Sequence, residues 1–144
     1  MVDFSELFKE EAQHKVSHSR RPLRHEEHSL QCACVRWFRM QWPQYSRLLF
    51  AIPNGVRTSR GVAIKAKAEG MVAGAPDLIL SVPRGGYGLL AIEMKTKRGQ
   101  QSAEQKAWQR EAEKVGNRYI VVRSIEQFIS IINEYLRNGK TTEE

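Results

Sequence analysis

An apolar strand that ends in charged residues constrains this chain more than any other feature. Residues 89–92 are wholly apolar, and Glu93 and Lys95 follow at its end. The run comes after Gly85-Gly86, which predicts a strand over residues 88–95 that returns from a hairpin loop. Because side chains alternate along a strand, Glu93 and Lys95 project from the same face. Charges at the end of a buried strand require partners or a function.

A second predicted strand, over residues 77–82, precedes the first and opens with Asp77 directly after Pro76. If the hairpin pairs the two strands antiparallel, Asp77 lies near the end that carries Glu93 and Lys95. Carboxylate oxygens are ligands that Mg²⁺ and Mn²⁺ prefer, and a lysine can orient or deprotonate an attacking water. The pattern indicates metal-dependent hydrolysis of a phosphate ester. A turn aspartate and a solvated Glu-x-Lys face would give the same short pattern, so both interpretations are open on these residues alone.

The other segments complete an alternation of helices and strands. They are a helix ended by Pro43, a short buried strand followed by a turn, a helix or ordered loop, a helix capped by Ser102, a strand, and a last helix capped by Ser124. They span residues 26–42, 48–52 with the turn at 53–55, 57–70, 102–115, 118–122 and 124–136. The order α-β-(α)-β-β-α-β-α predicts an α/β fold with a mixed central sheet flanked by helices.

The charge balance indicates an acidic partner. The chain has a formal net charge of +7, which is typical of proteins that bind nucleic acid. Six basic residues flank the two strands in sequence, and we interpret them as contacts to phosphates that position DNA without reading its bases. They are Arg57, Arg60, Lys65, Lys67, Lys97 and Arg98.

These blocks resemble a known family. Pro76-Asp77, a gap of 15 residues and then Glu93-Met94-Lys95 resemble the PD-(D/E)XK nucleases. The surrounding blocks, over about residues 26–136, resemble the VRR-NUC (virus-type replication-repair nuclease) domain of that superfamily. They are Glu27…Gln31, residues 52–55, residues 69–77, Gln105 and the closing strand and helix. The resemblance implies a restriction-endonuclease-like core.

By matching positions, the resemblance implies that Asp77 and Glu93 bind the metal and that Lys95 is catalytic. It implies the backbone carbonyl of Met94 as a further ligand. Mg²⁺ or Mn²⁺ is the implied cofactor.

Two helix-borne residues complete the implied site. Glu27 matches the family's helix acid, with Glu26 as the alternative one residue away, and Glu27 shares a helix face with Gln31. A first-turn acid would also complement the helix dipole. Gln105 is implied to line the site and touch the water or phosphate, although it could act only as a capping residue.

The resemblance implies a stand-alone phage or bacterial endonuclease that cuts branched DNA, such as four-way junctions or flaps, as a homodimer. Apolar side chains on the first and last helices would supply the dimer interface, or would pack into the core. The alternatives are a catalytically silent DNA-binding module and an RNA-binding protein. The first is disfavoured because Asp77, Glu93 and Lys95 are all present, and the second does not explain the carboxylates on a buried strand.

The sequence also predicts an organisation and a compartment. We expect an arm over residues 1–25, the nuclease domain over 26–137 and a polar tail over 138–144. Cys32 and Cys34 point in different directions on a helix, so no disulfide is expected between them. No stretch approaches the ~18 apolar residues of a membrane span. We therefore expect a cytoplasmic protein of a bacterial or phage-infected cell.

Overall fold

Four strands form one mixed sheet in the order β1-β2-β3-β4. They span Leu49–Ala51, Leu78–Leu80, Leu90–Met94 and Arg118–Val122. The first three pair antiparallel in turn, and β3 pairs β4 in parallel. This is the mixed sheet that the sequence predicts.

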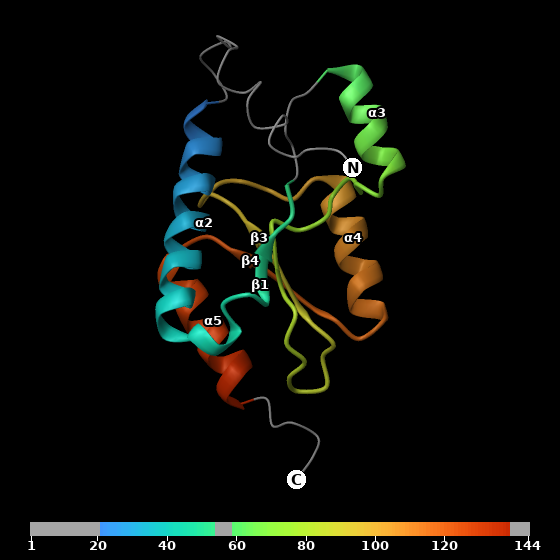
Figure 1. Cartoon of the computed structure of the whole chain (residues 1–144). Coiled ribbons are helices and arrows are strands. Elements are labelled where there is room, and N and C mark those ends of the chain that lie inside the picture. Colours follow the sequence, from blue (N-terminus) through green and yellow to red (C-terminus); the bar gives the residue numbers. More distant parts are fainter. Residues whose placement is uncertain (1–20, 54–58, 139–144) are drawn as a thin grey trace.

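The computed structural model describes residues 21–53 and 59–138 (Figure 1). Four α-helices and one short 3₁₀ helix surround the sheet. They are α2 (Arg21–Gln41), η2 (Pro43–Tyr45), α3 (Arg60–Ala68), α4 (Ala103–Lys114) and α5 (Ile125–Asn138). The observed order confirms the predicted sequence of elements. No helix in the described ranges is long and apolar enough to cross a membrane.

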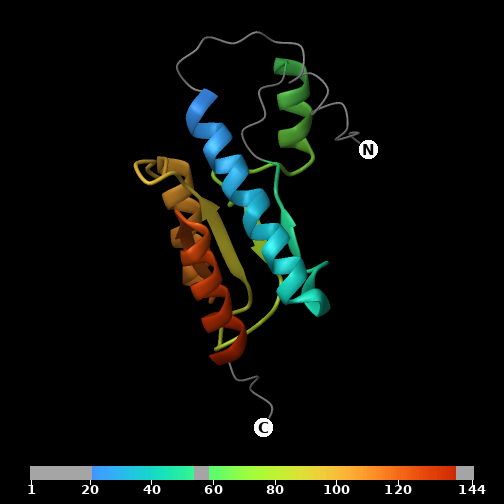
Figure 2. The same ribbon diagram turned by 90° about the vertical axis from the view of Figure 1, so that its left-hand side faces the viewer.

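Helices α2 and α5 cover one face of the sheet, and α4 covers the other (Figures 1 and 2). Every residue of β3 is buried, because this strand has a neighbour on each side and helices over both faces. Because side chains alternate along β3, its residues contribute to two core clusters, one on each face of the sheet. Ile92 packs with Phe128 of α5 in the larger cluster, whereas Ala91 packs with Tyr119 in a smaller cluster that contacts Trp108 of α4.

The first helix starts earlier than the sequence indicates. It begins at Arg21, not at residue 26. Pro22 is its second residue, and a proline in the first turn of a helix leaves no intrahelical hydrogen bond unmade. Residues 21–25, which the sequence places in the predicted arm, therefore belong to the helix.

Strand β1 is less buried than predicted for residues 48–52. Leu49 is buried, but Phe50 is 47% exposed and Ala51 is also exposed. This strand lies at the edge of the sheet, and α4 packs against β4 at the opposite edge. Phe50 and Ala51 therefore stay exposed at this edge of the sheet. The expectation of a wholly buried strand was wrong.

Segment 57–70, left open as helix or loop, is helical over α3. Ser59 caps this helix, because its side chain accepts a hydrogen bond from the backbone N–H of Val62 at 3.4 Å. The described residues do not include positions 54–58, which hold most of the predicted turn at 53–55 and the basic candidate Arg57.

Candidate active site

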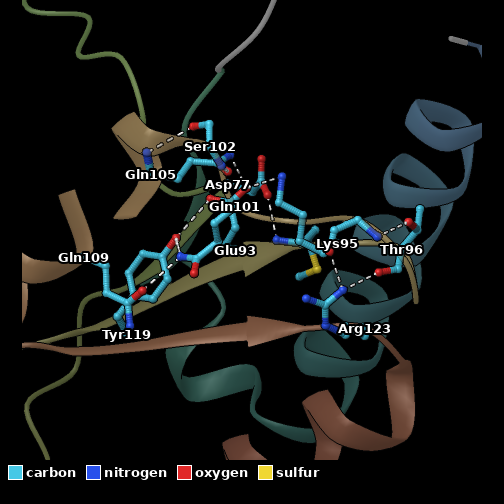
Figure 3. A network of polar contacts seen from close by, with 12 residues as sticks. Asp77, Glu93, Lys95, Thr96, Gln101, Ser102, Gln105, Gln109, Tyr119 and Arg123 are labelled. Atoms are coloured by element: carbon cyan, nitrogen blue, oxygen red, sulfur yellow. Dashed lines mark hydrogen bonds and ion pairs between the residues drawn. The ribbon is translucent and has the colours of Figure 1, made fainter. Parts of the chain in front are cut away.

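Asp77 is held beside the end of β3. In the observed register Leu78 pairs with Ile92, so the next pair along the hairpin brings Asp77 opposite Glu93. The Oδ2 atom of Asp77 accepts a hydrogen bond from the backbone N–H of Met94 at 2.7 Å (Figure 3). Its backbone carbonyl accepts from Ile52 at 2.9 Å. The antiparallel hairpin therefore brings the predicted carboxylates together.

Glu93 is a buried carboxylate with only 2% of its surface exposed. Its Oε1 atom accepts a hydrogen bond from the Nε2 atom of Gln105 at 2.9 Å and lies 3.9 Å from the Nζ atom of Lys95. Its Oε2 atom accepts from the hydroxyl of Tyr119 at 3.4 Å. Side chains from β4, from α4 and from the residue directly after β3 thus converge on one carboxyl group (Figure 3).

Gln105 caps α4 and also reaches Glu93. Its Oε1 atom accepts from the backbone N–H of Ser102 at 2.8 Å, and Ser102 accepts in return from the backbone N–H of Gln105 at 3.1 Å. This capping box starts α4 and fixes the amide group of Gln105. The Nε2 atom is then directed at Glu93. The side-chain amide of Gln105 therefore caps the helix with its oxygen and contacts Glu93 with its nitrogen.

Gly74 allows the segment before Asp77 to lie against α4. It has a φ of +82°, and a Cβ atom there would lie 2.3 Å from backbone atoms of Glu104 and 2.7 Å from the backbone nitrogen of Gln105. Only glycine fits both the backbone conformation and the space. Close packing explains this residue, and it places the Asp77 segment beside the Gln105 helix turn.

The electrostatics of the pair favour a bound cation. Burial, followed by repulsion from Asp77 and a hydrogen bond with it, raises the pKa of Glu93 from 4.5 to about 9, although Lys95 opposes the shift. Two carboxyl groups in contact therefore retain a proton near neutral pH. A divalent cation would supply the positive charge that the pair lacks, and oxygen ligands of this kind suit Mg²⁺ and Mn²⁺.

The described residues contain no group of three or more His, Cys, Asp and Glu side chains close enough to hold a metal ion. A cation here would therefore have Asp77 and Glu93 as its carboxylate ligands and would complete its shell with backbone oxygen, water or substrate. Mg²⁺ is commonly held in this way, by one or two carboxylates. The donor set fits the implied cofactor.

Of the two candidate acids on α2, Glu27 acts on the pair. Its charge contributes to the raised pKa of Glu93. Glu27 is half-buried, whereas Glu26 is exposed and lines a neighbouring hollow. The geometry thus favours Glu27 over Glu26 as the helix-borne acid, and Gln31 is half-buried one turn further along.

A basic hollow adjoins the carboxylates. Its lining is formed by Glu26, Leu30, Lys95, Thr96, Lys97, Arg98 and Arg123. The guanidinium of Arg123 donates through one nitrogen to the backbone carbonyls of Thr96 at 2.7 Å and Gly99 at 2.6 Å. Arg123 thereby clamps the loop that carries Lys97 and Arg98.

Sequence reasoning overlooked two residues, Tyr119 in β4 and Arg123 directly after it. Met94 pairs with Val122 in the parallel register, so the next residues, Lys95 and Arg123, are also neighbours. Tyr119 pairs with Ala91 and faces the same side as Glu93. A basic residue directly after the strand was a signal for Arg123. Tyr119 was indistinguishable from an ordinary aromatic strand residue.

The remaining basic candidates are separate from the hollow. Arg60, Lys65 and Lys67 are exposed on α3, which lies beyond the end of the sheet at which β3 terminates (Figure 1). The structure does not bring them into the carboxylate site. Helix α3, which carries them, lies at the same end of the molecule as the hollow (Figure 1).

Aromatic and cysteine residues pack as the sequence indicates. Trp37 and Trp42 contact the larger core cluster, and Trp108 contacts the smaller one. Cys34 is buried and Cys32 exposed, and neither forms a disulfide.

Comparisons with known proteins point in one direction. The sequence model described as the VRR-NUC domain matches residues 9–126. A solved structure described as a "VRR_NUC domain protein" is similar to this chain, with a TM-score of 0.69 and 28% sequence identity. The alignment covers 79% of this chain and 90% of that one. No curated protein matches.

The raised pKa of Glu93 predicts a stability change in the metal-free protein. Below pH 4.5 Glu93 is protonated in both the folded and unfolded states, and its contribution to stability is lost as pH rises toward about 9. A glutamine carries no such proton. Glu93→Gln should therefore raise the melting temperature in chelator by several degrees, with a gain that grows between these pH values.

Thermal denaturation between pH 4 and 9 measures this. Glu111→Gln, an exposed change on α4, is the control and should show no such trend. A gain for Glu93→Gln that is absent, or constant with pH, contradicts the assignment.

Proposed function

The chain belongs to the VRR-NUC domain family, a family of nucleases, and we propose that it is a metal-dependent DNA endonuclease. The observation that carries the proposal is the convergence of Asp77, Glu93 and Lys95 at the ends of two buried strands. We further propose branched DNA, such as four-way junctions or flaps, as its substrate. Family resemblance alone supports this finer choice.

Asp77 and Glu93 would hold Mg²⁺ or Mn²⁺, with the backbone carbonyl of Met94 as a further candidate ligand. Glu27, the other candidate, does not form a group of three ligating side chains with them in the described structure, so its carboxylate would act on the cation through its charge. When bound, the cation would stabilise negative charge on the phosphate and lower the pKa of water. The proposed roles of the remaining residues follow from their positions around Glu93.

Lys95 presents an ammonium group 3.9 Å from the Oε1 atom of Glu93. Its side chain is only 12% exposed, so its charge is weakly screened by solvent. We assign it to orient the attacking water and to stabilise charge that develops on the phosphate. Gln105, on the opposite side of the same carboxylate oxygen, would contact the water or a phosphate oxygen.

We propose that the basic hollow receives a phosphate next to the scissile one. Lys97, Arg98 and Arg123 line it together with Lys95, so several basic side chains lie next to the reacting centre. The exposed basic residues of α3 would contact the duplex separately. Contacts of this kind position a backbone without selecting a base sequence.

Cleavage assays on four-way and linear DNA test the proposal. We expect cleavage with Mg²⁺ or Mn²⁺, none in excess chelator, and binding without cleavage in Ca²⁺. Lys95→Ala should lose at least about 100-fold in rate, in line with general acid–base or charge stabilisation, while it retains DNA binding. Lys114→Ala, in the last turn of α4, is the control and should cleave normally.

Full cleavage in chelator would refute metal dependence. A folded Lys95→Ala protein that cleaves at the wild-type rate would refute the role of the lysine. DNA binding without cleavage by the wild-type protein would favour a silent DNA-binding module, and a preference for RNA would favour the other alternative.

The salt dependence of binding locates the DNA surface. Each neutralised phosphate contributes about 0.9 to the slope of log K against log salt concentration. Lys97→Ala with Arg98→Ala, and Lys65→Ala with Lys67→Ala, should each flatten this slope by up to about 1.8. Fluorescence anisotropy in Ca²⁺ measures it. Arg110→Ala with Lys114→Ala is the matched control, and a flattening as large in the control would move the DNA surface to α4.

We propose that the chain acts as a homodimer, because symmetrical cutting of a four-way junction needs two active sites across a two-fold axis. Trp37 and Ile131 pack against the core, so they do not supply a free interface. Met40, 72% exposed on α2, and Phe50 on the edge strand are open to contact. Light scattering should give twice the 16.6 kDa mass of one chain. A mass of 16.6 kDa at micromolar concentration would refute the dimer.

A further inference from the structure

The two oxygens of Glu93 are held by different elements of the fold. Gln105 of α4 donates to Oε1 at 2.9 Å, and Tyr119 of β4 donates to Oε2 at 3.4 Å. We propose that Tyr119 is a positioning residue that fixes the Oε2 atom of Glu93 and so raises the affinity of the site for a divalent cation. This inference rests on the proposed metal-dependent function.

The parallel register brings Tyr119 to this carboxylate. Tyr119 pairs with Ala91, two residues before Glu93 and on the same face of the sheet. Its ring is 7% exposed and packs against Trp108, with 6.1 Å between ring centroids. The ring is therefore held by its neighbours, and its hydroxyl group reaches toward Glu93.

A chain of hydrogen bonds determines which way the Tyr119 proton points (Figure 3). At the exposed end, the Nε2 atom of Gln109 donates a hydrogen bond to the Oε1 atom of Glu113 at 2.8 Å. The Oε1 atom of Gln109 is then turned toward Gln101 and accepts from its Nε2 atom at 2.9 Å. The first two links thus run from Gln101 outward to the surface.

The same Nε2 atom of Gln101 also donates to the hydroxyl oxygen of Tyr119, at 3.2 Å. Because that oxygen already accepts from Gln101, the hydroxyl proton is free to donate to Glu93. Every donor and acceptor in this series of hydrogen bonds is consistent with the Tyr119 hydroxyl donating to Glu93. The arrangement therefore presents a donor, and not a second acceptor, to the buried carboxylate.

Fixing both oxygens has a consequence for cation binding. A carboxylate held at one oxygen can rotate about its terminal torsion, and ordering it opposes binding. Hydrogen bonds to both oxygens remove that freedom before the cation arrives. Partners that orient a metal ligand typically contribute about 10- to 100-fold in metal affinity. The 3.4 Å length of the Tyr119 contact places our expectation at the lower end of that range.

Tyr119→Phe removes the hydroxyl and keeps the ring. Isothermal titration of the DNA-free protein with Mn²⁺ should show about a 10-fold weaker affinity. Tyr135→Phe is the matched control. Its buried hydroxyl donates to the backbone carbonyl of Val82 at 2.6 Å, away from the site, so this variant should lose stability and bind Mn²⁺ normally.

Gln101→Leu tests whether the hydrogen bond from Gln101 directs the Tyr119 hydroxyl toward Glu93. It removes the donor that occupies the Tyr119 oxygen, so Mn²⁺ affinity should fall in the wild-type background and show no further fall in Tyr119→Phe. Melting temperatures of all variants in chelator separate loss of affinity from loss of folding.

The outcomes are distinguishable. Mn²⁺ affinity unchanged in folded Tyr119→Phe, or equally weakened in Tyr135→Phe, overturns the inference and leaves the proposed nuclease intact. Additive effects of Gln101→Leu and Tyr119→Phe overturn the hydrogen-bond chain. Wild-type protein that binds no Mn²⁺ overturns the proposed metal site and this inference with it.

Discussion

Burial of the Glu93 carboxylate is the constraint on which the site depends. Removing a charged group from water costs several kcal/mol unless partners replace its hydration. Here the partners come from three parts of the chain, namely Lys95 directly after β3, Gln105 of α4 and Tyr119 of β4. An apolar residue at the same position would stabilise the sheet at no such cost. The cost of burying Glu93 is consistent with a functional role for its carboxylate, because its partners keep that group in a fixed position.

The local structure around Glu93 is arranged to keep these partners in place. The capping box at the start of α4 fixes Gln105, and the positive-φ Gly74 lets the Asp77 segment lie against the same helix turn. Arg123 clamps the loop after Lys95. Backbone contacts thus carry most of the positioning, and the reactive side chains stand on strand ends and a capped helix.

The candidate site places an acidic pair of side chains next to basic ones. Burial, followed by the neighbouring carboxyl group of Asp77, raises the pKa of Glu93, whereas the chain as a whole carries a net charge of +7. The hollow lined by Lys97, Arg98 and Arg123 adjoins this acidic pair. In the proposed function, the basic side chains would attract a polyanion and the carboxyl pair would attract a divalent cation. The two preferences together fit phosphodiester hydrolysis.

The sequence by itself determined the order of elements, the mixed sheet and the meeting of Asp77, Glu93 and Lys95, because hairpin pairing and strand alternation are local properties. It misjudged the start of the first helix and the burial of Phe50, since both depend on what lies beside them. Only the tertiary structure brought Tyr119 and Arg123 to the site. A parallel register between strands joined by a helix depends on packing across the whole sheet, and no local pattern records it.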